Sequence, residues 1–140
     1  MNLTKHIALA FAFTAPLMAG AAAAAELPPL REVQEIDQNM LWAGLAVEVS
    51  DECSTIEVKK IKGISFLWGL KNKASAMGYT DDEIRAYVES DDEEARIRRL
   101  GEAYVRQAGF DPKTPEGLCA FGEAEIARGS VIGSFLRSTK

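Results

Sequence analysis

The sequence predicts an all-α protein, a single compact bundle of about five to six helices tied by one disulfide. Three observations support this fold class. Apolar residues recur at intervals of three and four, the spacing that places them on one face of a helix. Residues that start and stop helices divide the chain into segments of helical length. No run alternates apolar and polar residues with enough β-branched and aromatic side chains to predict a strand.

The first 25 residues have the three parts of a secretory signal peptide. Lys5 supplies the positive start, residues 7–18 form an apolar run, and residues 23–25 are a small-residue cleavage site. We therefore expect residues 1–25 to be removed and the mature protein to be periplasmic or secreted. The alternative is an uncleaved membrane anchor, which the proline and glycine in this segment disfavour.

Residues 26–140 are long enough to bury one core and are expected to form a single helical domain. They contain 15 basic and 21 acidic residues, a net charge of −6, because the removed segment takes one lysine and no acid. This charge disfavours nucleic acid and anionic membranes as partners. No membrane span is expected after cleavage, and the oligomeric state is left open.

Two long helices are expected in the first half of the domain. Residues 31–50 carry apolar side chains at the spacing of an amphipathic helix. The central helix is placed over residues 53–78. Its apolar side chains cover far more than one stripe, so it needs neighbours on several sides, and Phe66 and Trp68 are assigned to the core.

Capping signals mark the helices that follow. Thr80 with Glu83, and Ser90 with Glu93, form the pattern of a capping box, in which a hydroxyl caps the helix and a carboxylate reaches back. They predict a short helix and then a longer one.

A third start is Thr114, which is followed by a proline and predicts a helix to about residue 128. A last short helix is expected within residues 130–140. Three glycines are expected to act as left-handed helix stops: Gly78, Gly109 and Gly129.

Cys53 and Cys119 are the two cysteines of the chain. Export would bring them to an oxidising compartment, so we expect them to form one disulfide. A loop of this length stabilises the fold by about 4 kcal/mol on the chain-entropy model. This disulfide would join the start of the central helix to the first turn or so of the Thr114 helix. The alternative, a reactive cysteine, lacks a neighbouring histidine or a redox spacing.

The sequence offers little catalytic chemistry. Its one histidine, His6, lies in the predicted signal peptide, and no glycine-rich phosphate loop occurs. We therefore predict no catalytic residue, no cofactor and no metal. Two acidic clusters, residues 81–83 and 91–94, are the alternative as a carboxylate-dependent site. Both lie in predicted first helical turns, where capping and the helix dipole account for them.

Four residues are candidate partner contacts. Arg96 and Arg99 belong to an arginine group suited to an acidic partner surface, although a solvated helix face that pairs with glutamates is the simpler interpretation. Trp42 and Tyr79 are the candidate aromatic anchors, because such residues dominate interface energetics.

A set of short motifs carries a family resemblance. They are Leu27-Pro28-Pro29-Leu30-Arg31-Glu32, Phe66-Leu67-Trp68, Gly78-Tyr79 with Asp81-Asp82-Glu83-Ile84, Gly117-Leu118-Cys119 and Ala127-Arg128-Gly129-Ser130. With them, the stretch from Leu27 to Leu136 resembles an uncharacterised family of small exported helical proteins of Gram-negative bacteria, a domain of unknown function. The resemblance implies no activity, substrate or site residue.

These observations favour a non-catalytic binding or protein-interaction module whose partner is another envelope protein. Two alternatives stay open. One is a small carboxylate-dependent hydrolase acting on cell-envelope material, and the other is a passive envelope or chaperone component.

Overall fold

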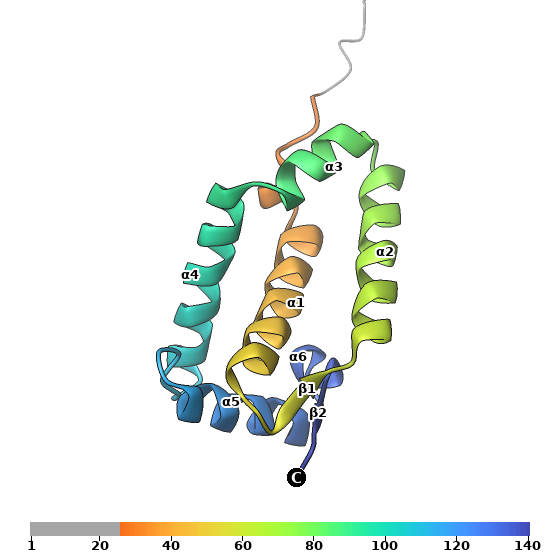
Figure 1. The fold of residues 1–140 in the computed structure, drawn as a ribbon. Helices are drawn as coiled ribbons and strands as arrows, with labels where there is room; N and C mark the ends of the chain where they lie inside the picture. Colours follow the sequence, from red (N-terminus) through yellow and green to blue (C-terminus); the bar gives the residue numbers. More distant parts are fainter. Residues whose placement is uncertain (1–25) are drawn as a thin grey trace, which may run out of the picture.

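The computed structural model describes residues 26–140, and the predicted signal peptide lies outside the described residues. Helices α4, α1 and α2 run side by side, while α3 crosses one end and α5 and α6 lie at the other (Figure 1). The all-α fold with one disulfide is confirmed. In chain order the elements are η1 (Leu30–Glu32), α1 (Gln34–Glu52), β1 (Ile56–Val58), α2 (Lys60–Ala76), α3 (Asp81–Val88), α4 (Asp91–Gln107), α5 (Pro115–Ala127), α6 (Val131–Ser134) and β2 (Leu136–Ser138).

The predicted capping signals set the helix boundaries. The hydroxyls of Thr80, Ser90 and Thr114 each accept a hydrogen bond from the backbone N–H three residues later. The Glu83 carboxylate also accepts from the Thr80 N–H, at 2.7 Å, which completes a capping box. The three predicted glycine stops all have positive φ angles, +106° in the case of Gly78. Side chains with a Cβ are strained there.

Residues 53–59 do not belong to the central helix, which corrects the prediction. Cys53 ends α1, where its N–H donates to the Val49 carbonyl. Residues 56–58 form β1, which pairs antiparallel with β2, with Ile56 opposite Ser138. The expectation of no strands was therefore wrong, and residues 130–140 form a helix only over α6. Strands of three residues are too short to show alternation, and their pairing partner lies at the far end of the domain.

The main core lies where the C-terminal half of α1 meets α5, α6 and the two strands. Gly122 lets α5 approach closely, because a Cβ there would lie 2.6 Å from Val49 Cγ1 and 2.7 Å from Ile56 Cδ1. The cluster consists of Leu45, Ala46, Val49, Cys53, Ile56, Val105, Leu118, Phe121, Ile132, Phe135 and Leu136.

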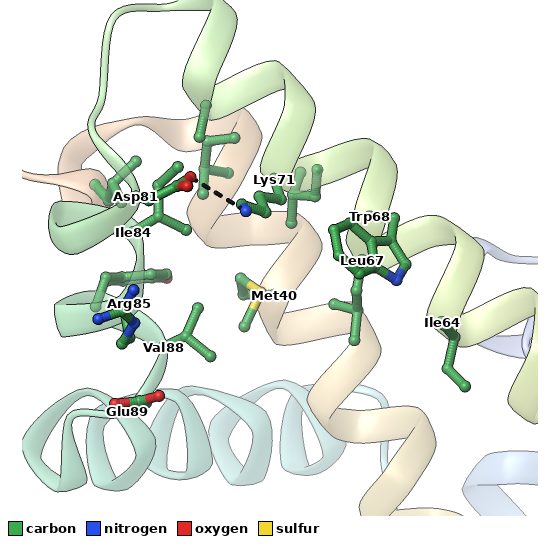
Figure 2. Close-up of a pocket in the computed structure, with 15 residues that line it drawn as sticks. Met40, Ile64, Leu67, Trp68, Lys71, Asp81, Ile84, Arg85, Val88 and Glu89 are labelled. Carbon is green, nitrogen blue, oxygen red and sulfur yellow. Dashed lines mark ion pairs between the residues drawn. The ribbon is translucent and has the colours of Figure 1, made fainter.

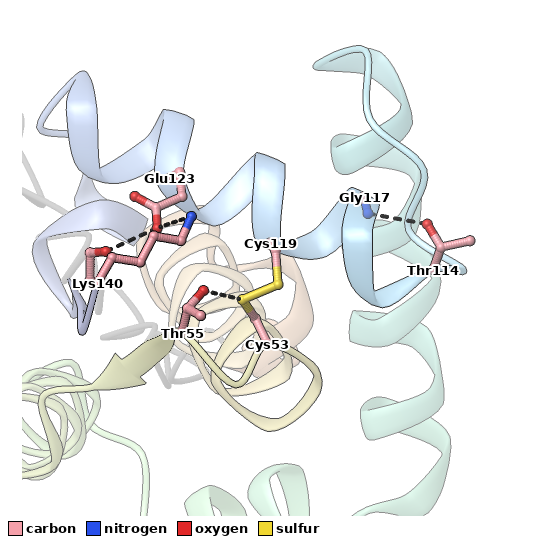
Figure 3. Close-up of a disulfide and its surroundings, with 8 residues drawn as sticks. Cys53, Thr55, Thr114, Gly117, Cys119, Glu123 and Lys140 are labelled. Carbon is pink, nitrogen blue, oxygen red and sulfur yellow. Dashed lines mark hydrogen bonds and ion pairs between the residues drawn. A yellow bond between two sulfur atoms is a disulfide. The ribbon is translucent and has the colours of Figure 1, made fainter.

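The disulfide closes this core (Figure 3). Cys53 and Cys119 are bonded with an S–S length of 2.05 Å, and their Cα atoms lie 5.2 Å apart. The bond joins the end of α1 to the second turn of α5, rather than the start of the central helix as predicted. The chain therefore leaves α1 at a covalently held corner and turns through β1 into α2.

A second, smaller core holds the opposite end. It consists of Leu30, Ile36, Leu70, Ala74, Tyr79 and Ile84. Helix α2 contributes only Leu70 and Ala74 as buried residues, so one narrow face attaches it to the rest of the domain. The remaining apolar side chains of α2 are left for the surface described next.

Candidate functional site

An open groove runs along α1 between the flanking helices α2 and α4. Met40, Ala43 and Val47 form its floor, at the i, i+3, i+7 spacing of one helix face. The groove has two adjoining parts, which share Met40, Leu67, Tyr87 and Val88 as lining residues. We call the whole the α1 groove.

The upper part of the α1 groove is apolar and has a volume of about 430 Å³. Leu67 and Val88 point toward Met40 from α2 and α3 (Figure 2). At its rim the Lys71 ammonium pairs with the Asp81 carboxylate at 3.1 Å. This part can receive large apolar side chains of a ligand or partner, because its walls offer them dispersion contacts and release from water.

The lower part, about 550 Å³ in volume, ends in acidic side chains. Glu48, Asp51 and Glu52 project from the last turns of α1, and none of them forms an ion pair within the described part of the chain. Burial raises the pKa of Glu48, an effect that the charge of Arg98 partly opposes. The lower end therefore attracts positive charge.

Helix α2 supplies one wall and exposes much of its apolar surface. Ile64 is 57% exposed and Trp68 is 60% exposed. The core assignment of Trp68 was therefore wrong, while Phe66 is half-buried and packs edge-on against Phe135 at 4.8 Å between ring centroids. The sequence predicted neighbours on several sides of this helix, and the chain supplies them on only one.

Arg96 is half-buried where α4 meets α1 and α3. Its guanidinium pairs with Asp37 and with Glu93, whose Oε2 is 2.7 Å from the arginine Nε. The Tyr87 hydroxyl donates to the same Asp37 carboxylate at 2.7 Å. The hydrogen bond to Asp37 raises the pKa of Arg96, and burial raises that of Tyr87. This network joins α1, α3 and α4.

The other three predicted contact residues lie in different surroundings. Arg99 is exposed on α4. Trp42 packs edge-on against Tyr104, with 4.9 Å between ring centroids. Tyr79 is buried and donates its hydroxyl proton to the Pro28 carbonyl at 2.5 Å. The structure does not bring these residues together, and none of them lines the α1 groove.

Five of the seven carboxylates in the two acidic clusters are engaged in structural contacts. Hydrogen bonds from Thr80 hold Glu83 and lower its pKa. Glu93 does not reach back to its cap as predicted, because it pairs with Arg31 and Arg96. Over residues 26–140, no group of three or more acidic, histidine or cysteine side chains is placed to hold a metal ion.

The groove residues were missed because each one alone has the pattern of a core residue. The available signal was the width of the apolar arc on α2, which exceeds what one neighbouring helix can cover. Met40, Val47 and Val88 carry no such signal, since their exposure depends on where α2 and α4 lie.

Comparison with known proteins identifies a family. A protein-family model described as a family of unknown function (DUF5333) matches residues 28–137. Neither a curated protein nor a solved structure matches the chain.

Proposed function

Because the chain belongs to this family of unknown function (DUF5333), we propose a function from the α1 groove: the protein is a non-catalytic interaction module that receives a helix of another protein there. The observation that carries the proposal is the groove itself, whose floor and walls are the exposed apolar faces of α1 and α2. Its natural setting is the periplasm or the cell exterior, which the predicted signal peptide supports.

The shape of the groove favours a helix as the occupant. Helices α4, α1 and α2 lie side by side, so the open face of α1 corresponds to the position of a missing fourth helix (Figure 1). Ala43 and Gly44 are small residues of the groove lining, so the backbone of a partner can approach α1 closely. A helix with apolar residues at i, i+3 or i+4 and i+7 fills such a groove.

The charges favour an orientation. The partner helix carries lysine or arginine at the end that lies beside Glu48, Asp51 and Glu52, since these carboxylates have no ion-pair partner among residues 26–140. A cationic end there lowers the cost of keeping Glu48 ionised in its partly buried position. The apolar end of the partner lies in the upper part.

Site-specific photo-crosslinking in cells tests the proposal. A photo-crosslinking amino acid replaces Val47 on the groove floor, and in a matched control it replaces Val131 on α6, since both valines are 49% exposed. We expect the Val47 position to capture one discrete envelope protein, at a helix with apolar i, i+3 or i+4, i+7 residues and a basic end. The Val131 position should not capture it.

A second variant shows whether the capture depends on the groove. Leu67→Asp places a charge on the groove wall and should reduce the yield of the Val47 crosslink at least tenfold. Leu67 is exposed, so the melting temperature should change little. No crosslink from Val47, or the same products from both valines, would refute the proposal.

A further inference from the structure

The outer side of α2 carries an apolar ridge that is separate from the groove floor. Ile61, Ile64 and Trp68 follow the i, i+3, i+7 spacing of one helix face, and Ile61 is 86% exposed. The buried residues of α2, Leu70 and Ala74, lie on another side. Ile64 and Trp68 also form the rim of the α1 groove, whereas Ile61 does not line it. Three large apolar side chains on one outer edge are unusual for a surface that meets only water.

Lysines flank this ridge at both ends, and Asp51 and Glu57 are the acidic residues beside Ile61. The N-terminal end of α2 carries Lys59, Lys60 and Lys62, and its C-terminal half carries Lys71 and Lys73. They are five of the seven lysines in residues 26–140, and no acidic residue occurs between Glu57 and Asp81. Helix α2 is therefore locally basic, although the net charge of residues 26–140 is −6.

Only some of these charges are neutralised within the chain. Lys71 and Lys73 pair with Asp81 and Glu35. Lys59 and Lys62 instead donate to the Ser134 carbonyl, at 3.3 and 3.0 Å, which leaves their charge uncompensated. An anionic surface placed against the ridge gains attraction from that end of the helix first.

We propose that α2 lies in the plane of an anionic lipid bilayer surface, with the ridge inserted among the lipid chains and the lysines at the headgroups. A basic amphipathic helix with tryptophan and isoleucine on its apolar side is the sequence form that binds such surfaces. No helix in residues 26–140 is long and apolar enough to cross a membrane.

Shape and charge select this occupant over others. Helix α2 is an outer helix of the three that run side by side, so its outer side is free to meet a flat surface (Figure 1). Its 17 residues are about 26 Å long, which spreads the contact over several lipids. A second copy packed on the same ridge in antiparallel fashion would bring the lysines at the two ends together, and like charges repel.

Vesicle binding measured by Trp68 fluorescence tests the proposal. The probes are vesicles of phosphatidylcholine alone and of equal parts phosphatidylcholine and phosphatidylglycerol. We expect binding and a blue shift only with the anionic vesicles, weakened by salt. The shift should persist in Trp42→Phe and disappear in Trp68→Phe, which assigns it to the ridge.

Two variants separate the ridge from the groove. Ile61→Ser should lower vesicle affinity about tenfold, whereas Val131→Ser, on α6, should leave it unchanged. Lys60→Gln with Lys62→Gln should lower it about fivefold for each lysine removed. None of these variants changes a residue that lines the α1 groove, so the Val47 crosslink should remain.

Failure to bind anionic vesicles at low salt would overturn the proposal, and so would equal binding to both vesicle types. A lysine- and Ile61-dependent complex with an acidic protein, in the absence of vesicle binding, would replace the bilayer with a protein surface and would also overturn it.

Discussion

The two ends of this domain are built differently. At the end formed by α5, α6 and the strands, a large cluster of buried residues packs around a disulfide, and the ring of Phe121 is fully buried. At the α2 and α3 end, a smaller cluster leaves Leu67, Trp68 and Val88 exposed. The comparison teaches that stability is concentrated at one end, which frees the other end to present apolar surface.

Two carboxylates beside the main core differ in how their burial is compensated. Glu125, in α5, is buried, and it accepts hydrogen bonds from Arg128 and Ser130, so its desolvation is compensated. Glu48, on the groove side of α1, is partly buried and forms no ion pair within residues 26–140. Desolvation is therefore compensated by hydrogen bonds at Glu125 and only partly by the charge of Arg98 at Glu48.

The largest expected effect on stability comes from truncating a buried aromatic side chain, compared with an exposed side chain of the groove wall. Phe121→Ala should cost about 5 kcal/mol of unfolding free energy, at the upper end for such changes, because the ring is fully buried. Leu67→Ala should cost less than about 1 kcal/mol, since this side chain is already exposed. Urea unfolding of both variants measures the difference. Equal losses would show that the groove wall is part of the stabilising core.

Removing the disulfide should have the next largest effect. The double variant Cys53→Ala with Cys119→Ala should lose about 4 kcal/mol, because the bond closes a loop across a sequence separation of 66 residues. Urea unfolding with and without a reductant gives the measurement. The reductant should destabilise the unaltered protein and leave the double variant unaffected, and a loss below about 1 kcal/mol would contradict the prediction.

Arg96 lies at the α3 end, where it pairs with Asp37, and its replacement should have an intermediate effect. Arg96→Met leaves the partly buried carboxylates of Asp37 and Glu93 without their shared cation, which should cost about 2 kcal/mol. Arg99→Met is the matched control on the same helix, and it should change stability by less than about 0.5 kcal/mol, because Arg99 is exposed. Thermal unfolding of both variants tests this. Similar losses would place the two arginines in equivalent surroundings.

The smallest effect concerns Glu48 and depends on pH. Burial raises the pKa of Glu48 in the folded state above its ordinary value of 4.5, so ionisation at neutral pH disfavours folding. Glu48→Gln should therefore stabilise the protein at pH 7, by less than about 1 kcal/mol because the site is partly solvated. The advantage should vanish as the pH falls below the unfolded-state pKa. Urea unfolding of both proteins at pH 7 and at a pH below the unfolded-state pKa measures this advantage. A larger advantage at the acidic pH would contradict the predicted direction.

Much of the fold could be predicted because its signals are local. A cap hydroxyl bonds a backbone N–H three residues away, and a glycine stop depends on its own φ angle, so Thr80 and Gly78 could be interpreted without the rest of the chain. The candidate site could not be predicted in this way. Whether Val47 or Trp68 is covered depends on elements distant in sequence, and the same apolar residue suits a core or an open groove.

The sequence by itself determined the helical class, the starts of α3, α4 and α5, the three glycine stops and the cysteine pair, because each depends on near neighbours or on residue type. Only the tertiary structure decided that β1 pairs with β2, that Asp37 holds Arg96, and that α2 is left half-uncovered. These are contacts between distant segments, which form only when the whole chain packs and which no local pattern encodes.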